Sequence, residues 1–214
     1  TKMVKKYAPQ FVTCEMQLGK ADLTLFKTFP NIGVDIENVA LINPMAGSPS
    51  DTLANINNLI VVVDAKKFLK EKEIVVRRCI LEDAFVNLYT DSIGNSNLDV
   101  FNAKKDNDTT SSSFDYLVDI EEVKLKNSIL FYTDDRNKMT AQAKGLNLDL
   151  EGSMMNDTID VELGLEASSL SLWMNDIDLA INDLGLNFDG TLEQKEVLDC
   201  LFELHTPDVS FAFK

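Results

Sequence analysis

The chain has 214 residues, 45% of them hydrophobic and 8% aromatic, which is enough for one large β domain or two small ones. A formal net charge of -15 and a sequence pI near 4.4 argue against a nucleic-acid partner, because such binding depends on clustered Lys and Arg. The same charge would be repelled by an anionic membrane surface. Contact with lipid would therefore have to come from apolar area, or from a segment outside this sequence.

The cysteines and the single histidine give no sign of a metal or cofactor site. Cys14, Cys79 and Cys200 are far apart, no CxxC pair occurs, and His205 is the only histidine. Cys14 and Cys79 lie in alternating apolar runs, where packing in the core is the expected role. We therefore predict no metal ligands and no bound cofactor.

Apolar and polar residues alternate through much of the first hundred residues, as is typical of strands with one buried face. We expect strands at residues 12–18, 23–25, 32–36, 56–63, 74–80 and 85–89. Short helical segments are predicted at residues 2–7 and at residues 64–69, the second capped by Asp64. Residues 43–51 should form a surface loop, and the polar residues 91–97 a turn.

A polar stretch at residues 102–113, predicted to be a mobile loop, divides an N-terminal β region at residues 1–101 from residues 114–214. The second part alternates almost without interruption and predicts a β-meander that continues the sheet. Separate apolar segments are expected at residues 118–120, 123–125, 129–131, 146–150, 159–165, 170–173, 177–181, 184–188, 197–204 and 209–213. A faint repeat relates LNLDLEG at 146–152 to LGLNFDG at 184–190, and either duplication or chance similarity of meander strands explains it.

An antiparallel sheet with one apolar face must bury that face against a second sheet, against helices or against a ligand. The expected helices are too short to cover a sheet of about ten strands. The sheet therefore either curls into a sandwich or barrel, or leaves a long apolar groove for a hydrophobic ligand or partner. The alternation alone favours the self-burying form, because most β proteins close their own core.

The polar residues form no recognisable catalytic constellation. Paired acids such as Asp134 and Asp135 fall at predicted turns or on the polar side of strands, where solvation explains them. No G-x-S-x-G elbow occurs, and His205 has no evident triad partners. Residues 106–108 resemble the start of a calcium loop but lack its glycine and final glutamate. Trp173 is expected in the core or at an interface, and we predict no catalytic residues and no enzymatic activity.

Several segments within residues 25–99 resemble the AsmA-like family of bacterial envelope proteins. LFKTFP at residues 25–30, followed by IGVDIENVAL at residues 32–41, is similar to a strand pair of that family. LIVVVDAKKFL at residues 59–69 is similar to its strand and short helix. The order and spacing continue through residues 74–76, 80–84, 91–94 and 97–99.

This resemblance implies the N-terminal periplasmic part of an AsmA-like outer-membrane biogenesis protein, anchored to the inner membrane by a segment outside this sequence. Together with the alternation, it predicts a mainly β fold: an elongated, twisted antiparallel meander with one or two short helices, curled to form an apolar concave face. It implies a hydrophobic groove for phospholipid acyl chains, and other envelope proteins as further partners. The alternative is a structural or protein-interaction β module with a closed core and no lipid ligand.

The groove is expected to be lined by apolar residues of one strand parity. The candidates are Val118, Ile120, Leu146, Leu148, Leu150, Val161, Leu163, Leu165, Leu184, Leu186 and Phe188. A pattern of Asp, then Ser or Thr, also recurs at residues 51–53, 91–93, 108–110 and 157–159. It resembles the O-glycosylation motif of Bacteroidetes, which modifies extracytoplasmic proteins, although chance would also produce it in a chain rich in Asp and Thr.

Overall fold

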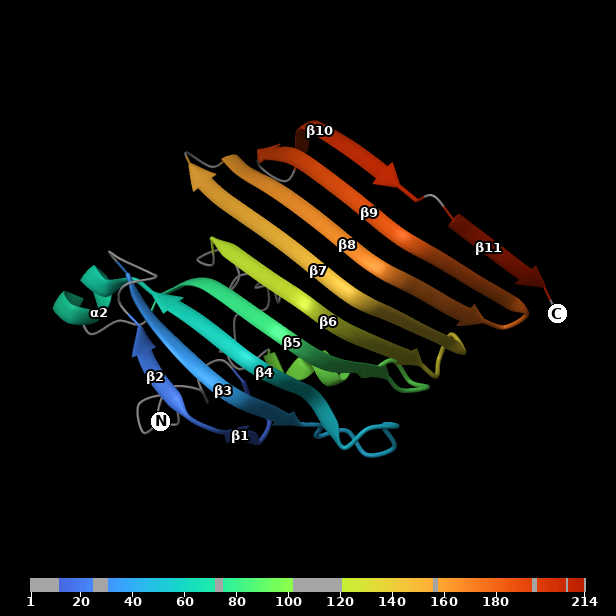
Figure 1. Cartoon of the computed structure of the whole chain (residues 1–214), viewed down its shortest axis with the longest axis horizontal. Helices are drawn as coiled ribbons and strands as arrows, with labels where there is room; N and C mark the ends of the chain where they lie inside the picture. Colours follow the sequence, from blue (N-terminus) through green and yellow to red (C-terminus); the bar gives the residue numbers. More distant parts are fainter. Residues whose placement is uncertain are drawn as a thin grey trace.

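The computed structural model describes residues 12–24, 31–71, 75–101, 121–155, 158–193, 196–206 and 208–213. Most of these residues belong to one long, twisted sheet of eleven strands (Figure 1). The strands are β1 (Met16–Leu18), β2 (Ala21–Thr24), β3 (Ile32–Ile42), β4 (Thr52–Val63), β5 (Val76–Thr90), β6 (Glu122–Asp134), β7 (Met139–Met155), β8 (Thr158–Met174), β9 (Ile177–Glu193), β10 (Glu196–His205) and β11 (Asp208–Phe213). The predicted mainly β fold is confirmed.

The strand order follows the chain from β3 to β10, with β1 and β2 both paired to β3, and β10 and β11 both paired to β9. Among the described strands the two ends of this order do not pair, so the sheet is open rather than closed into a barrel. Strands before and after residues 102–113 lie in the same sheet. The expected antiparallel meander is interrupted once, because β5 and β6 are parallel and therefore require a crossover connection.

Helices contribute little to the described structure. The helix α2 (Ala65–Glu71) follows β4, and the short 3-10 helix η2 (Asn97–Phe101) lies in the crossover after β5. Asp64 caps α2 as predicted: its Oδ1 accepts a hydrogen bond from the Lys67 N–H at 2.9 Å. That bond, and the Arg77 guanidinium at 2.9 Å, lower the pKa of the Asp64 carboxyl. The helical turn expected at residues 2–7 lies outside the described residues.

A row of unusual backbone conformations crosses the sheet near the middle of its strands. Asn38, Asp83, Asn127, Gly145 and Asp183 have φ between 46° and 57°, the left-handed region that Gly, Asn and Asp adopt more easily than other residues. They lie in β3, β5, β6, β7 and β9 and follow one another across the register. We refer to these five residues as the kink row.

Each kink shifts the side-chain alternation by one residue. In β3, Glu37 and Asn38 are both exposed, whereas Ile36 and Val39 on either side are both buried in the same apolar cluster. Apolar residues therefore stay on one face along the whole strand. β4 shows the same shift between Ile56 and Leu59, which both belong to the apolar cluster, although no residue of β4 has a positive φ.

The apolar face is covered over β3, β4 and β5. Its buried residues there pack against Val100 of η2 and against Val12, Cys14, Met16 and Leu18 near the N-terminus. The Thr13 N–H donates to the Val100 carbonyl oxygen at 2.8 Å, which ties these two covering segments together. We call this region, β1 to β5 with its covering segments, the covered half, and β6 to β10 the open half.

In the open half no described segment covers the same face. Among the described apolar residues of β6 to β9, only Ala143, Leu146 and Ala167 are buried. The neighbouring leucines of this face are half-buried. The self-burying sandwich or barrel that the alternation alone favoured is therefore not formed by the described residues.

The cysteines fit a packing role where the structure describes them. Cys14 packs against the apolar cluster of the covered half, and neither Cys14 nor Cys79 forms a disulfide. Burial raises the pKa of the Cys79 thiol to about 11. The Cys200 side chain lies outside the described residues.

Candidate functional site: an apolar sheet face

Directly paired residues build an apolar row that crosses nine strands without interruption. Since neighbours in register point to the same face of a sheet, these side chains share one face. From β2 to β10 the row consists of Ala21, Ile36, Leu59, Leu81, Leu125, Leu148, Leu165, Leu186 and Leu204. We call it the leucine row, because seven of these consecutive positions are leucine.

A second apolar row runs beside the leucine row, two residues away on each strand. It consists of Leu23, Val34, Val61, Cys79, Val123, Leu150, Leu163, Phe188 and Phe202. The two rows together make a continuous apolar band across the sheet. Eight strand spacings give this band a width of about 38 Å.

The apolar band continues along the strands, past the kink row, toward the turn at the other end of the sheet. In β7, β8 and β9 the residues that alternate onto this face carry no charge. They are Met139, Ala141, Ala143, Leu146, Leu148, Leu150 and Gly152 on β7; Val161, Leu163, Leu165, Ala167, Leu170, Leu172 and Met174 on β8; and Ile177, Leu179, Ile181, Leu184, Leu186, Phe188 and Gly190 on β9. A strand of 17 residues extends for about 55 Å.

The structure brings nine of the eleven predicted groove residues together on this face. Leu146 is buried, and the other eight, Leu148, Leu150, Val161, Leu163, Leu165, Leu184, Leu186 and Phe188, are half-buried. Val118 and Ile120 lie outside the described residues.

The prediction missed the other members of the leucine row, which belong to the same face. Leu59, Leu125 and Leu204 were expected as strand residues but not in the groove, and Leu81 lay outside the expected strands. The alternation in residues 56–63, 74–82, 123–125 and 197–204 could have identified these four leucines. The decisive step was to know that β5 pairs with β6.

At β10 the described residues leave the end of the band uncovered. Phe202 and Leu204, its last members, are 59% and 57% exposed, and Leu201 on the opposite face of β10 is also exposed. At the other edge, two short strands, β1 and β2, end the sheet. On β2, Leu23 at the other end of the band is 70% exposed, so both ends of the band are accessible to a ligand.

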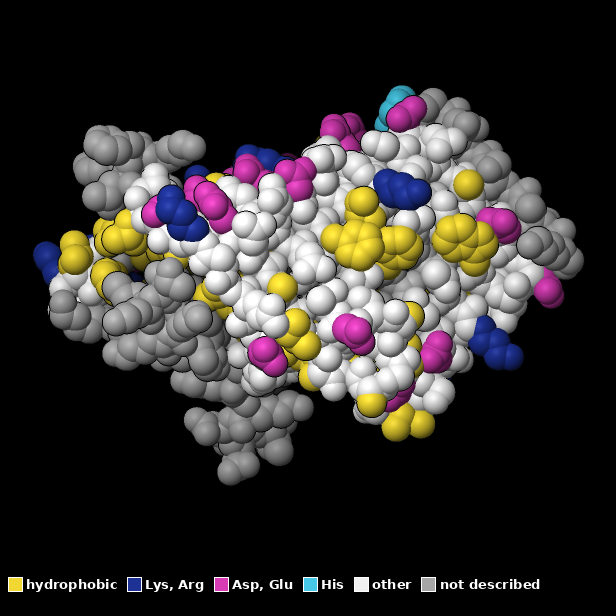
Figure 2. All heavy atoms as spheres, turned by 60° about the horizontal axis from the view of Figure 1, so that its bottom comes forward, with side chains coloured by type: hydrophobic (Ala, Val, Ile, Leu, Met, Phe, Trp, Pro, Cys, Tyr) yellow, Lys and Arg dark blue, Asp and Glu magenta, His cyan; other side chains and the backbone are white. Residues whose placement is uncertain are grey.

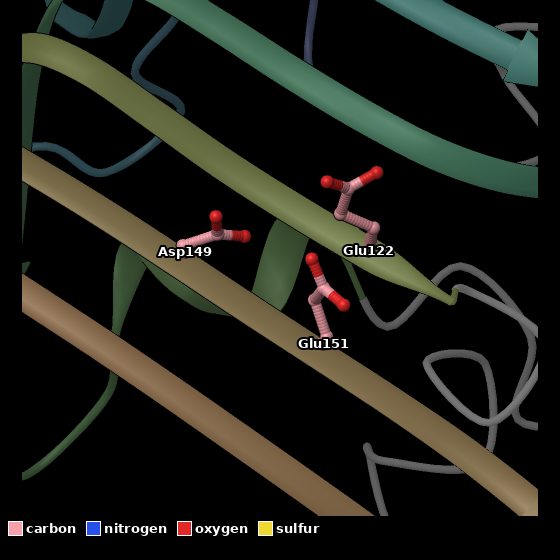
Figure 3. A group of neighbouring side chains, drawn as sticks. All are labelled: Glu122, Asp149 and Glu151. Carbon is pink, nitrogen blue, oxygen red and sulfur yellow. The ribbon is translucent and has the colours of Figure 1, made fainter. Parts of the chain in front are cut away.

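The opposite face is acidic beside the band. Glu122, Glu151, Glu162 and Asp189 are direct neighbours in register across β6 to β9. Glu122, Asp149 and Glu151 bring carboxylate oxygens within 4.8 Å of one another (Figure 3). Lys124 Nζ lies 2.5 Å from Glu122 Oε1 and 2.8 Å from Asp149 Oδ2. The Lys124 ammonium group thus already pairs with the carboxylates of this cluster, and Arg78 pairs with Glu122 as well.

The acids at the β6–β7 turn also have a structural explanation. Asp134 is buried, and its carboxylate accepts hydrogen bonds from the Asn137 backbone and side-chain amides and from the Tyr132 hydroxyl. These bonds, the Asn137 backbone N–H first among them, lower the pKa of Asp134. The Tyr89 hydroxyl donates to Asp135 Oδ2 at 2.6 Å, which raises the pKa of Tyr89. Both carboxylates stabilise the turn.

Comparison with known proteins adds no relative. No protein-family model matches the chain, and no match was found among curated proteins or among solved structures. In the part of the chain that the structure describes, no helix is both long and apolar enough to cross a membrane.

Proposed function

We propose that the apolar band binds phospholipid acyl chains, and that the chain is a periplasmic module of an inner-membrane-anchored protein that takes part in lipid transport during outer-membrane biogenesis. The observation that supports this proposal best is the uncharged, half-buried face of β7, β8 and β9. Monomeric soluble proteins rarely expose contiguous apolar patches larger than a few hundred Å², and larger ones mark binding sites.

The dimensions of the band suit an extended hydrocarbon chain. One leaflet of a bilayer contributes about 15 Å of hydrocarbon, half of the core thickness. Both the width and the length of the band exceed this value. The absence of charged side chains on this face of β7 to β9 lets an acyl chain lie along it without desolvating a charge.

The acidic surface determines which part of a lipid can bind. A net charge of -15 disfavours anionic headgroups at the surface, so the affinity has to come from buried apolar area. Each methylene removed from water contributes about 0.8 kcal/mol. The headgroup would remain in solvent.

A matched pair of variants tests this proposal. The protein is incubated with vesicles of phosphatidylethanolamine and phosphatidylglycerol, separated from them, and its bound lipid is counted by native mass spectrometry. Leu186→Asp places a charge on the apolar band, and Asn187→Asp places the same charge on the opposite face of the same strand. We expect the first variant to lose bound lipid and the second to keep it. Wild-type protein without any bound lipid, or equal loss in both variants, would contradict the proposal.

A second candidate role is protein interaction through the edge of the sheet. It is favoured by β10, where Leu201, Phe202 and Leu204 are all more than half exposed. Exposed apolar edge strands are ready sites for pairing with a further strand. Glu203→Pro tests this role, because Pro removes a backbone N–H from β10. Loss of partner binding in Glu203→Pro, with partner binding kept in Leu186→Asp, would favour this role over lipid binding.

A further inference from the structure

The kink row divides the face opposite the apolar band into two chemically different parts. On the side that includes Glu122, strands β6 to β9 present many charges: Glu122, Lys124, Lys126, Asp149, Glu151, Asp160, Glu162, Glu166 and Asp189. On the other side of the kink row, the same strands present only Lys144 and Asp178 as charged residues on that face. A protein of net charge -15 thus has a nearly neutral area on its polar face.

Aromatic rings stand exposed in this neutral area. Trp173 on β8 is 41% exposed and Phe85 on β5 is 38% exposed, so neither lies in the core. Phe131 on β6 packs against Phe85, with ring centroids 5.4 Å apart and an interplanar angle of 53°. Figure 2 shows hydrophobic side chains gathered in separate groups on a surface that is otherwise largely polar. Trp173 was expected in the core or at an interface, and its exposure excludes the core.

The register places Trp173 on the same face as the phenylalanines. Trp173 pairs with Thr140, and Thr140 pairs with Thr133, two residues beyond Phe131 on β6. Two strand spacings and two residues along the strand separate Phe131 from Trp173, which amounts to about 12 Å between their backbone positions. The two aromatic groups thus form separate platforms on one sheet surface.

Uncharged hydrogen-bonding groups fill the space between the platforms. Gln142 is the register neighbour of Phe131, and Ser171 is the register neighbour of Gln142. Thr140 lies between Thr133 and Trp173. We call Phe85, Phe131, Thr140, Gln142, Ser171 and Trp173 the aromatic face.

We propose that the aromatic face binds a neutral, extended oligosaccharide. A pyranose ring presents C–H bonds on its two faces and hydroxyl groups around its rim. Its faces can stack on exposed aromatic rings, and its hydroxyls can bond the amide and hydroxyl groups between them. Pockets for such ligands combine aromatic side chains with a few polar groups that fix orientation.

The charge and polarity of this surface argue against two other classes of ligand, nucleic acids and acyl chains. A nucleic acid also stacks on aromatic rings, but its phosphates require clustered cations, and the described residues of this area offer Lys144 alone. An acyl chain would have to cross the polar side chains of Gln142 and Ser171 to reach both platforms. A neutral glycan meets neither obstacle.

The single tryptophan of the chain makes this proposal directly measurable. Because Trp173 is the only Trp, a ligand stacked on it changes all of the tryptophan fluorescence of the protein. Cellohexaose, laminarihexaose and chitohexaose are titrated separately into the full chain. We expect a saturable emission shift with at least one of them. By calorimetry, Trp173→Ala and Phe131→Ala should each weaken binding at least tenfold.

The matched control is Phe202→Ala, which removes an aromatic ring that is 59% exposed from the opposite face. It should bind the oligosaccharide like the wild type, and circular dichroism should show all variants folded.

The proposal is overturned if none of the three sugars gives a saturable emission shift at millimolar concentration. Binding that persists in both Trp173→Ala and Phe131→Ala also overturns it. Self-association in sedimentation that Trp173→Ala abolishes, without sugar binding, would assign the surface to a second copy and also overturn it. Lipid binding involves the other face, so the two proposals fail independently.

Discussion

The covered half and the open half of the sheet carry the same apolar band but use it differently. In the covered half, Val100 and residues 12–18 pack on the band and leave residues such as Leu53 only 1% exposed. In the open half, the described leucines of this face on β6 to β9 are half-buried apart from Leu146, and so are Leu59 and Leu81 in the covered half. The pairing and the alternation are shared, so the difference comes from the covering segments. A band that is covered stabilises the fold, and the same band left open can bind a ligand.

Truncation of a core leucine should produce the largest difference between the halves. Leu53→Ala, in the covered half, should lower the free energy of unfolding by about 2 to 5 kcal/mol, because it leaves a cavity. Leu163→Ala, in the open half, should lower it by about 1 kcal/mol or less, since solvent or a neighbouring side chain can fill the space. Urea denaturation followed by circular dichroism measures both. Equal losses would show that the open half is packed as tightly as the covered half.

The backbone conformation of the kink row should affect the stability of the open half, where side-chain packing contributes less to the free energy of unfolding. Gly145 has a φ of 57°, and a Cβ atom added there would overlap the Ser168 hydroxyl. Gly145→Ala should therefore destabilise the protein by about 1 to 3 kcal/mol.

The matched control for this kink is Gly152→Ala on the same strand. Its added Cβ would lie 3.9 Å from the Asp160 carbonyl oxygen, an ordinary contact, and its φ is not positive. This variant should unfold at nearly the same urea concentration as the wild type. A Gly145→Ala variant as stable as Gly152→Ala would show that the positive φ is not required for the fold.

The smallest expected effect is a pH dependence at the turn that joins the first two strands of the open half. The pKa of Asp134 is lowered in the folded protein, so its carboxylate stabilises the fold fully above its unfolded pKa of about 3.9. This contribution is lost as the pH falls through the lower, folded pKa. Asp134→Asn should therefore have a lower melting temperature than the wild type at pH 7, and the gap should narrow toward pH 2.5.

Thermal denaturation across this pH range measures the effect. Asp176→Asn, at the exposed β8–β9 turn, serves as the control. The melting temperature of this variant should stay close to that of the wild type across the range. A gap for Asp134→Asn that stays constant from pH 7 to pH 2.5 would rule out the carboxylate charge as its cause.

Local patterns predicted much of the fold. The alternation identified the mainly β class and the parity of the nine described groove residues, and Asp64 marked the start of α2. These features depend on residues within a few positions of one another. The segments at 146–152 and 184–190, noted as a faint repeat, flank β8 on its two sides, and each follows a kink-row residue.

The same patterns divided strands that are continuous. Two strands were expected at residues 74–80 and 85–89, but residues 76–80 and 85–89 both belong to β5, with Asp83 between them; residue 74 lies outside the described residues. The segments at 159–165 and 170–173 likewise form β8. In β5 the positive φ of Asp83 shifts the alternation by one position; in β8 the same shift falls between Ala167 and Leu170 without a positive φ. In the sequence such a shift looks like a turn. Only the pairing with neighbouring strands shows that the chain continues straight through.

By itself the sequence determined that this protein is a sheet with one apolar side, because side-chain alternation is a local property of the chain. Whether that side is covered or open was decided by tertiary contacts between distant segments. Thr13 meets Val100, 87 positions away, and the parallel pairing of β5 with β6 joins the apolar rows of both halves. Such contacts leave no local signal, because they depend on where the backbone of each segment lies after folding.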